Sequence, residues 1–153
     1  MSPSGWPIRP VLIASSILLY VTAAFLPALT FRVFSDSPAQ FSLENHRGYN
    51  LLLLGGLTLL VGFPAWLANP LWAAGIIALL RHRVIGARML LGGAVLLALV
   101  SLTLFRHRLP HDEAGVTKML LQRPLIGFYL WLSSIVLALI AAMTGPAPAG
   151  PPR

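Results

Sequence analysis

Cysteine is absent from this chain of 153 residues, which excludes disulfides, thiolate metal ligands, thiol nucleophiles and a cysteine-linked lipid anchor. Charged residues are scarce, at 10%, where a soluble domain usually holds roughly 25%. Only four residues are acidic, whereas 57% are hydrophobic. This composition cannot supply a surface suited to water, so it predicts an integral membrane protein in contact with the lipid bilayer.

The net charge of +7 has a different meaning here from the one it would have in a soluble protein. The lysines and arginines lie between apolar segments, where they usually hold loops against anionic lipid headgroups. No folded soluble portion with a basic face is expected. Nucleic-acid binding is therefore not predicted.

Four apolar segments stand out, and each is predicted to be helical because hydrocarbon offers no partner to backbone N–H and C=O groups. Each has the roughly 20 residues needed to cross a bilayer. The simplest architecture is an all-α, up-and-down antiparallel bundle of four transmembrane helices in one domain over 1–144. The tail at 145–153, rich in proline and glycine, is expected to be disordered. The predicted helices are Val11 to Phe31, Asn50 to Leu80, Val84 to Phe105, and Pro124 to Thr144.

The first apolar segment has two readings. Val21-Thr22-Ala23 loosely fits a signal-peptide cleavage site, but the apolar run continues beyond it through "AFLPALTF". A secretory core is usually about 7 to 15 residues long. A retained membrane anchor is the better interpretation.

Orientation rests on the distribution of lysine and arginine. With alternating crossings the two faces carry five and six basic residues, which does not decide the matter. The rule that positive loops stay inside weighs short connections most heavily, and "RHRVIGAR" at 81–88 is the tightest one. Both termini are therefore predicted to be cytoplasmic. All four acids fall on the opposite face.

The second segment is too long for one straight crossing. Its roughly 31 residues would extend about 46 Å as a continuous helix. Pro64 and Pro70 each lack an N–H, so a kink or a short unwound turn is predicted between residues 60 and 70, in a long, proline-kinked second helix. Asn69 then has two interpretations: it closes a hydrogen bond to a carbonyl released at the kink, or the broken helix is a binding element. Trp66 would share its helix face.

Several stretches together resemble a known type of protein. They are the lead "LLLLGGLTLLVGFP", the core "AWLANPLW", the following "ALLRHR" and the late "GFYLWLSS". The chain is similar over 48–140 to a family of small, functionally uncharacterised bacterial inner-membrane proteins. "WLANP", Trp66 to Pro70, is the specific part. Weaker support comes from Gly127, Tyr129, Leu130, Trp131 and Ser133. The resemblance implies four crossings of a bacterial inner membrane and implies no activity.

The fourth segment carries aromatic and small residues. Tyr129 and Trp131 fit an interfacial aromatic belt, while the alternative is that Trp131 packs against Trp66 or Asn69 inside the bundle. Small residues recur every four positions and permit close approach of another helix, in the same chain or in a second copy. They are Ser134, Ala138 and Ala142, with Ala94 and Ala98 as a shorter set on the third helix.

The loop after the third segment holds the richest set of chemical groups. His107 and His111 are weak candidates for metal ligands, and His46 with Glu44 would lie on the same side of the membrane. Pro110 interrupts any helix that would align the first two, so a solvated polar loop is the expected structure. No metal or other cofactor is predicted. Motifs for phosphate binding, for a serine nucleophile elbow and for a zinc protease are all missing.

Three functions remain open. A non-catalytic accessory or assembly subunit is favoured, because no carboxylate lies within the apolar segments and small residues suit helix packing. The first alternative is a small oligomeric transporter or channel that uses the broken second helix around Asn69. The second is a membrane enzyme or metal site on the face with His46, His107 and His111. The predicted partners are the bilayer and either another membrane protein or further copies of the chain.

Overall fold

The structure is a computed structural model that describes residues 8–35, 41–106, 108–110 and 117–144. Along the chain, α1 is followed by two strands, then by a group of helices, then by two more strands and a last helix. The helices are α1 (Ile8–Phe25), α2 (Gly48–Leu54), α3 (Ala68–Leu80), α4 (Val84–Val100) and α5 (Ile126–Met143), with 3₁₀ segments η1 (Gly55–Val61), η2 (Pro64–Leu67) and η3 (Ser101–Arg106). The strands are β1 (Pro27–Ser35), β2 (Phe41–Arg47), β3 (Arg108–Pro110) and β4 (Thr117–Pro124).

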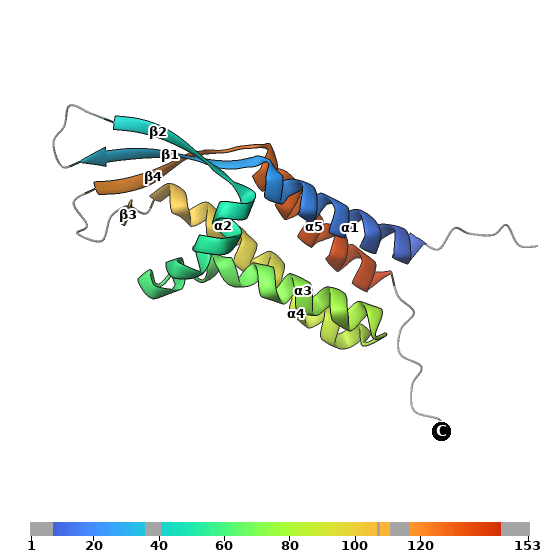
Figure 1. Cartoon of the computed structure of the whole chain (residues 1–153). Coiled ribbons are helices and arrows are strands. Elements are labelled where there is room, and N and C mark those ends of the chain that lie inside the picture. The colour runs from blue at the N-terminus through green and yellow to red at the C-terminus, as the bar shows by residue number, and fades with distance from the viewer. Residues whose placement is uncertain (1–7, 36–40, 107, 111–116, 145–153) are drawn as a thin grey trace, which may run out of the picture.

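Four helices form an elongated bundle, with α1 and α5 above α3 and α4 (Figure 1). α1 packs on α5, α3 packs on α4, and α4 also contacts α5. α1 begins and α5 ends at the same end of the bundle, where the turn between α3 and α4 also lies. α1, α4 with its continuation, and α5 are long and apolar enough to cross a membrane. The prediction of apolar, membrane-length helices is confirmed for these three.

The surface of the bundle is strongly apolar. Large side chains such as Leu18, Met89 and Leu96 are each at least two-thirds exposed. Soluble monomers rarely expose apolar surface of this kind in contiguous patches. The exposed residues are therefore typical of helices that contact lipid.

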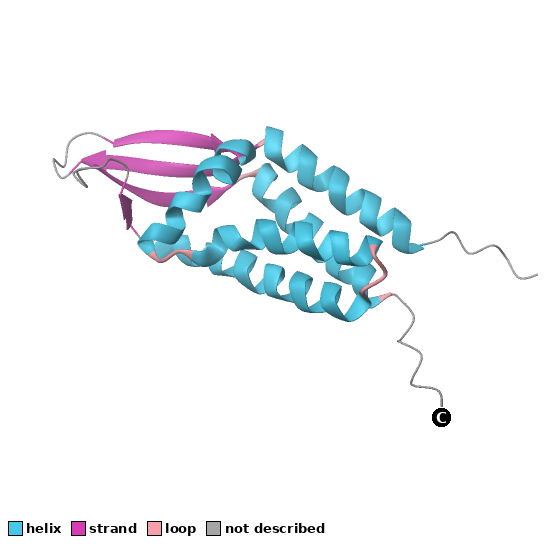
Figure 2. Cartoon of the chain, turned by 60° about the horizontal axis from the view of Figure 1, so that its bottom comes forward, coloured by secondary structure: helices cyan, strands magenta, loops and turns pink. Residues whose placement is uncertain are grey.

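A small antiparallel sheet extends from the end of the bundle opposite the start of α1 and the end of α5, so the prediction of an all-α chain is wrong (Figure 2). Its strand order is β2-β1-β4-β3. The predicted first helix ended at Phe31, but α1 stops at Phe25 and residues 27–35 form β1. Phe31 and Val33 are buried while Arg32 between them is exposed, so burial alternates in this part of β1. That period of two favours a strand, because every second side chain then reaches the same face.

The fourth helix also starts later than predicted. Pro124 was expected in its first turn but is the last residue of β4, and α5 begins at Ile126. Leu125 between them has extended backbone angles, φ −113° and ψ 179°. Pairing of β4 with β1 as far as Leu29 opposite Pro124 keeps this stretch in the sheet.

The second segment is broken in two rather than kinked. Gly62, at φ +79°, takes the left-handed conformation that ends η1, and Phe63 is extended before Pro64. Helical structure then resumes at Pro64 and continues through Asn69 and Pro70 to Leu80. The break lies within the predicted interval of 60–70. Glycine, which accepts a positive φ without steric cost, is what ends the first half.

Small residues bring the helices together inside the chain. Ala138 and Ala142 on α5 and Ala94 and Ala98 on α4 are fully or almost fully buried. Ser134, the first residue of the α5 set, is buried as well. The small-residue sets therefore serve packing within one copy of the chain.

The contact between α3 and α4 depends on Gly75. A Cβ added there would lie 2.5 Å from Cγ and Cδ2 of Leu91, a side chain with no exposed surface. We expect Gly75→Ala to lower the free energy of unfolding by about 2 kcal/mol, because the core must overpack or Leu91 must leave its rotamer. Thermal unfolding in detergent measures the loss. Combining it with Leu91→Ala should cost less than the sum of the two single changes, and strict additivity would contradict the contact.

Candidate functional site

A cavity of about 850 Å³ lies where the sheet, the α2–η1 segment and the bundle meet. This volume is within the range of small-molecule sites, about 300 to 1,000 Å³. Its walls are mainly apolar. The sheet contributes Leu29, Phe31, His46 and Met119; α2 and η1 contribute Leu51, Leu54, Leu57, Thr58 and Leu60; the bundle contributes Tyr20, Ala24, Asn69, Phe128 and Trp131, among others.

Asn69 is the centre of a polar cluster at the bundle side of the cavity. Its Oδ1 accepts hydrogen bonds from the Tyr20 hydroxyl on α1 and from Nε1 of Trp131 on α5, both at 2.9 Å. Its Nδ2 donates to the carbonyl of Trp66 at 3.1 Å. Pro70 has no N–H to offer that carbonyl, which lies four residues before it. The amide therefore links three helices and also replaces the hydrogen bond that proline removes.

A second polar layer lies about one helical turn farther from the sheet. Ser16 on α1 donates to the carbonyl of Ser134 on α5 at 2.7 Å. It also accepts a hydrogen bond from Nε1 of Trp72 on α3 at 3.1 Å. The Trp72 ring stacks on Tyr20, with ring centroids 3.9 Å apart. The same three helices are thus joined twice, by residues spaced three or four apart on each.

Trp66 fixes the fold-back of the second segment. Its Nε1 donates to the carbonyl of Leu52 at 2.8 Å, and its ring lies against Gly55 and Gly56. In a straight helix, positions 14 apart would be separated by about 21 Å. The bond therefore holds α2 and η1 beside the start of α3, where they form one wall of the cavity.

The lining residues with the most exposed side chains lie on α2 and η1, so we take this wall as the mouth of the cavity. Among the lining residues, Leu54 and Leu57 are each 63% exposed and Leu60 is 83% exposed. The sequence contains no charged residue between Gly48 and Leu80. An opening rimmed by leucine without nearby charge on its own segment is suited to lipid rather than to water.

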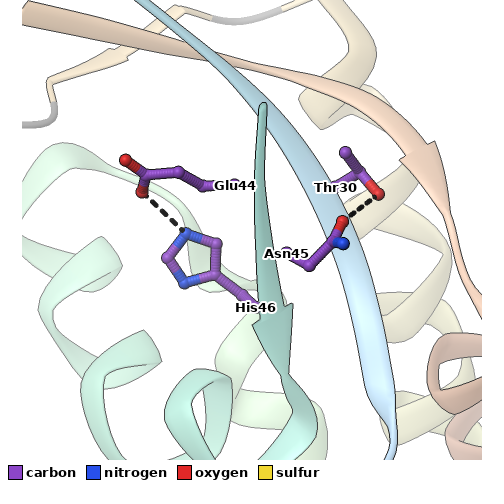
Figure 3. Close-up of polar contacts among 4 residues, drawn as sticks. All are labelled: Thr30, Glu44, Asn45 and His46. Atoms are coloured by element: carbon purple, nitrogen blue, oxygen red, sulfur yellow. Dashed lines mark hydrogen bonds and ion pairs between the residues drawn. The ribbon is translucent and has the colours of Figure 1, made fainter. Parts of the chain in front are cut away.

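On the sheet side of the cavity, the His46 ring has a nitrogen without a hydrogen-bond partner in the part of the chain that the structure describes. Glu44 and His46 extend from one face of β2, and Asn45 extends from the other to accept a 2.8 Å hydrogen bond from Thr30 (Figure 3). His46 Nε2 is 3.8 Å from Glu44 Oε2, too far for a hydrogen bond. Among the described residues, this buried Nε2 has no hydrogen-bond partner. An unpaired buried polar atom costs free energy, so it marks a place where a ligand group would be stabilised.

Basic residues border the sheet where it joins the helices. Arg47 pairs with Pro27 at the start of β1, and Arg123 pairs with Thr30 on the other side of the same strand. Both side chains are exposed. At the far end of the bundle, Arg88 donates from Nε to the carbonyl of Ala142 at 3.1 Å.

The structure brings together most of the residues singled out in the second segment. Trp66, Asn69 and Trp131 share one cluster, and Pro64 begins the helical turn that carries Trp66. Pro70 does not break its helix. It cannot donate a backbone hydrogen bond to the carbonyl of Trp66, and Asn69 Nδ2 supplies a donor instead. His107 and His111 lie outside the described residues. Within the part of the chain that the structure describes, no three potential metal ligands lie together.

Sequence reasoning missed Tyr20, Ser16 and Trp72. The signal was present: Ser16 and Tyr20 are four apart in a mainly apolar helix, and Asn69 and Trp72 are three apart. Polar side chains that share a face of a membrane helix commonly hydrogen-bond across helices. Their partners on other helices had no sequence signature.

Comparisons with protein-family models, with curated proteins and with solved structures give no significant match.

Proposed function

We propose that this chain is a non-catalytic membrane protein that binds an apolar molecule drawn from the bilayer. The cavity beneath the sheet is the binding element, and the broken second segment forms its lipid-facing wall. The observation that carries the proposal is the combination of a ligand-sized volume with a mouth made of exposed leucines.

The placement in the membrane follows from the polarity of the two ends. α3 with η2, Pro64–Leu80, would add a fourth and shorter crossing of about 25 Å. The termini and the arginines at 81–88 would then lie on the cytoplasmic side of a bacterial inner membrane, and the sheet would lie on the opposite side. The cavity mouth would open at the depth where the acyl region meets the headgroups.

Binding without catalysis is supported by the groups that line the cavity. Among the described residues, no carboxylate bonds to the cluster around Asn69, and Tyr20 and Trp131 both donate hydrogen bonds to Asn69. Among the described residues, His46 is paired with one carboxylate, that of Glu44. The alternative of a small transporter would use the same cavity, because a transporter also has to bind the molecule that it moves out of the bilayer.

An enlarged side chain on the cavity wall should abolish binding. We expect Ala24→Phe, on the part of α1 that lines the cavity, to remove a co-purifying apolar molecule from the protein. Ala73→Phe is the matched control, because Ala73 is exposed on α3 and does not line the cavity. Mass spectrometry of the intact protein released from detergent measures the bound mass, with circular dichroism to check the fold. Equal occupancy in both variants would rule out this cavity as the site.

A second candidate, the accessory or assembly subunit, is favoured by a different feature. β2 is the outer strand of the sheet, so one of its edges has no neighbouring strand among the described residues. Such an edge can accept a strand from another protein. Recovery of a stoichiometric protein partner in mild detergent, together with an empty cavity, would favour this candidate over ligand binding.

A further inference from the structure

The two faces of the sheet differ in charge. Directly paired residues of neighbouring strands share a face. Leu29 and Phe31 line the cavity and pair with His46 and Glu44, so these two polar residues lie on the cavity face of β2. In this part of the chain, a ligand group at the cavity face therefore meets a carboxylate rather than a cation. The basic side chains that the structure describes in the strands lie on the opposite face: they are Arg32, Arg47, Lys118 and Arg123.

Glu44 and His46 are placed to share one small polar group. Both side chains extend from the same side of β2 (Figure 3), and His46 Nε2 lies 3.8 Å from Glu44 Oε2, beyond hydrogen-bond distance. Nε2 is buried and has no hydrogen-bond partner among the described residues. The edge of the His46 ring packs on Phe31, with ring centroids 5.3 Å apart, which limits its rotation. A single oxygen about 2.8 Å from each of the two atoms could bond to both.

The hydrogens determine which group fits between them. A carboxylate only accepts hydrogen bonds, and an imidazole beside it is stabilised with a hydrogen on the facing nitrogen. The bridging group must therefore accept from Nε2–H of His46 and donate to Oε2 of Glu44. A hydroxyl does both. An ionised carboxylate or a phosphate diester cannot donate, and an ammonium group cannot accept.

The surroundings determine the rest of the ligand. The cavity walls are mainly apolar, and the most exposed lining residues are leucines of α2 and η1. A hydroxyl is uncharged, so it loses less solvation than an ammonium group on entering such a cavity. A lipid alcohol, an apolar chain that ends in a free hydroxyl, combines the two requirements.

We propose that the cavity binds a lipid alcohol whose hydroxyl bridges His46 Nε2 and Glu44 Oε2 and whose chain fills the apolar part. This inference rests on the proposed function, because it names the class of molecule that the cavity binds. It requires no covalent step.

Three probes with the same brominated chain test the inference: a long-chain alcohol, its methyl ether and the corresponding fatty acid. Trp66 and Trp131 line the cavity, so a bound brominated chain should quench their fluorescence. The ether keeps the oxygen but cannot donate to Glu44, and the acid is ionised at alkaline pH. With purified full-length protein in detergent at alkaline pH, we expect the alcohol to bind about tenfold more tightly than the ether, the effect of one hydrogen bond to a charged group. The acid should bind more weakly than the ether, because Glu44 repels it.

Two variants of β2 show which groups hold the hydroxyl. Glu44→Leu removes the acceptor, so the alcohol and the ether should then bind equally. His46→Phe keeps an aromatic ring beside Phe31 and removes Nε2, so both probes should bind more weakly. Arg47→Gln is the matched control, because it removes a charge from the same strand on the opposite face, and it should keep the tenfold preference.

The outcomes separate the two proposals. Equal affinity of the native protein for alcohol and ether, a preference that persists in Glu44→Leu, or tighter binding of the acid would overturn the lipid-alcohol inference while apolar binding in the cavity stands. Quenching that saturates with none of the probes, or that saturates equally in Ala24→Phe, would overturn the proposed function itself.

Discussion

Asn69→Leu is expected to destabilise the bundle by about 2 to 4 kcal/mol. The leucine removes the acceptor of Tyr20 and Trp131 and the donor to the Trp66 carbonyl. At about 0.6 kcal/mol for an average interhelical hydrogen bond in a membrane, the three bonds account for about 2 kcal/mol. The loss reaches about 4 kcal/mol if the Tyr20 hydroxyl and Trp131 Nε1 find no water as a new partner. Each unpaired buried donor then costs about 1 to 3 kcal/mol. Thermal or denaturant unfolding in detergent measures the change.

Asn50→Leu is the matched control for this substitution. Asn50 also lines the cavity, but its side chain has no hydrogen bond to the described residues. Its replacement should change stability by less than about 0.5 kcal/mol. Removing the donors as well, with Tyr20→Phe and Trp131→Phe, should reduce the cost of Asn69→Leu, because no polar group is then left unpaired. A cost that is unchanged in the triple variant would show that the cluster does not act as a unit.

Gly48→Ala is the second change with a large expected effect, a loss of about 3 kcal/mol, at the upper end for an overpacked site. A Cβ at this position would press on the carbonyl oxygen of Ala23 and would lie 2.9 Å from Cα of Ala24. These atoms belong to the backbone of α1, so no flexible side chain can move aside. Gly48 also donates from its N–H to the carbonyl of Leu26 at 3.0 Å, which fixes the start of α2 against the end of α1.

Gly56→Ala is the control for the glycine substitution. Its added Cβ would lie 3.7 Å from the Trp66 ring, an ordinary contact, in the same part of the chain. It should leave stability unchanged or raise it by up to about 1 kcal/mol, because alanine loses less backbone entropy on folding. Comparison of the two unfolding midpoints in the same detergent measures the difference. Equal midpoints would contradict the close approach of α2 to α1.

These two changes act on different parts of the same site. Asn69 joins α1, α3 and α5 at the bundle side of the cavity, while Gly48 positions α2 as its lateral wall. A variant at Gly48 that still folds should shift α2 and weaken ligand binding. A variant at Asn69 should loosen the helices that form the opposite side.

The break in the second segment was predictable in location but only partly in form. Pro64 and Pro70 mark residues 60–70 because each removes a backbone donor. The sequence pattern did not single out Gly62 as the residue with a positive φ, and the return of Trp66 to the Leu52 carbonyl depends on a contact between residues 14 positions apart. A local pattern does not contain such contacts.

The first strand of the sheet was predicted as part of a helix, because its first residues belong to a long apolar run. Residues 27–31 continue an apolar run that is typical of a helix in a membrane, yet they pair with β2 as a strand. β1 is stabilised by β2 and by β4, and the latter lies about 90 residues later in the chain. Only the folded chain brings these strands together, because each alone would leave its backbone groups unpaired.

The amino-acid sequence by itself indicated long apolar helices and an irregularity in the second segment between residues 60 and 70, because hydrocarbon burial and proline chemistry act locally. It also indicated Trp66 and Asn69 as candidate hydrogen-bonding or binding residues near that irregularity. Only the tertiary structure decided that Asn69 bonds to Tyr20 and Trp131, that two connecting stretches form one sheet, and that a cavity lies between sheet and bundle. Those features arise from distant segments meeting in space, and their register follows from packing rather than from neighbouring residues.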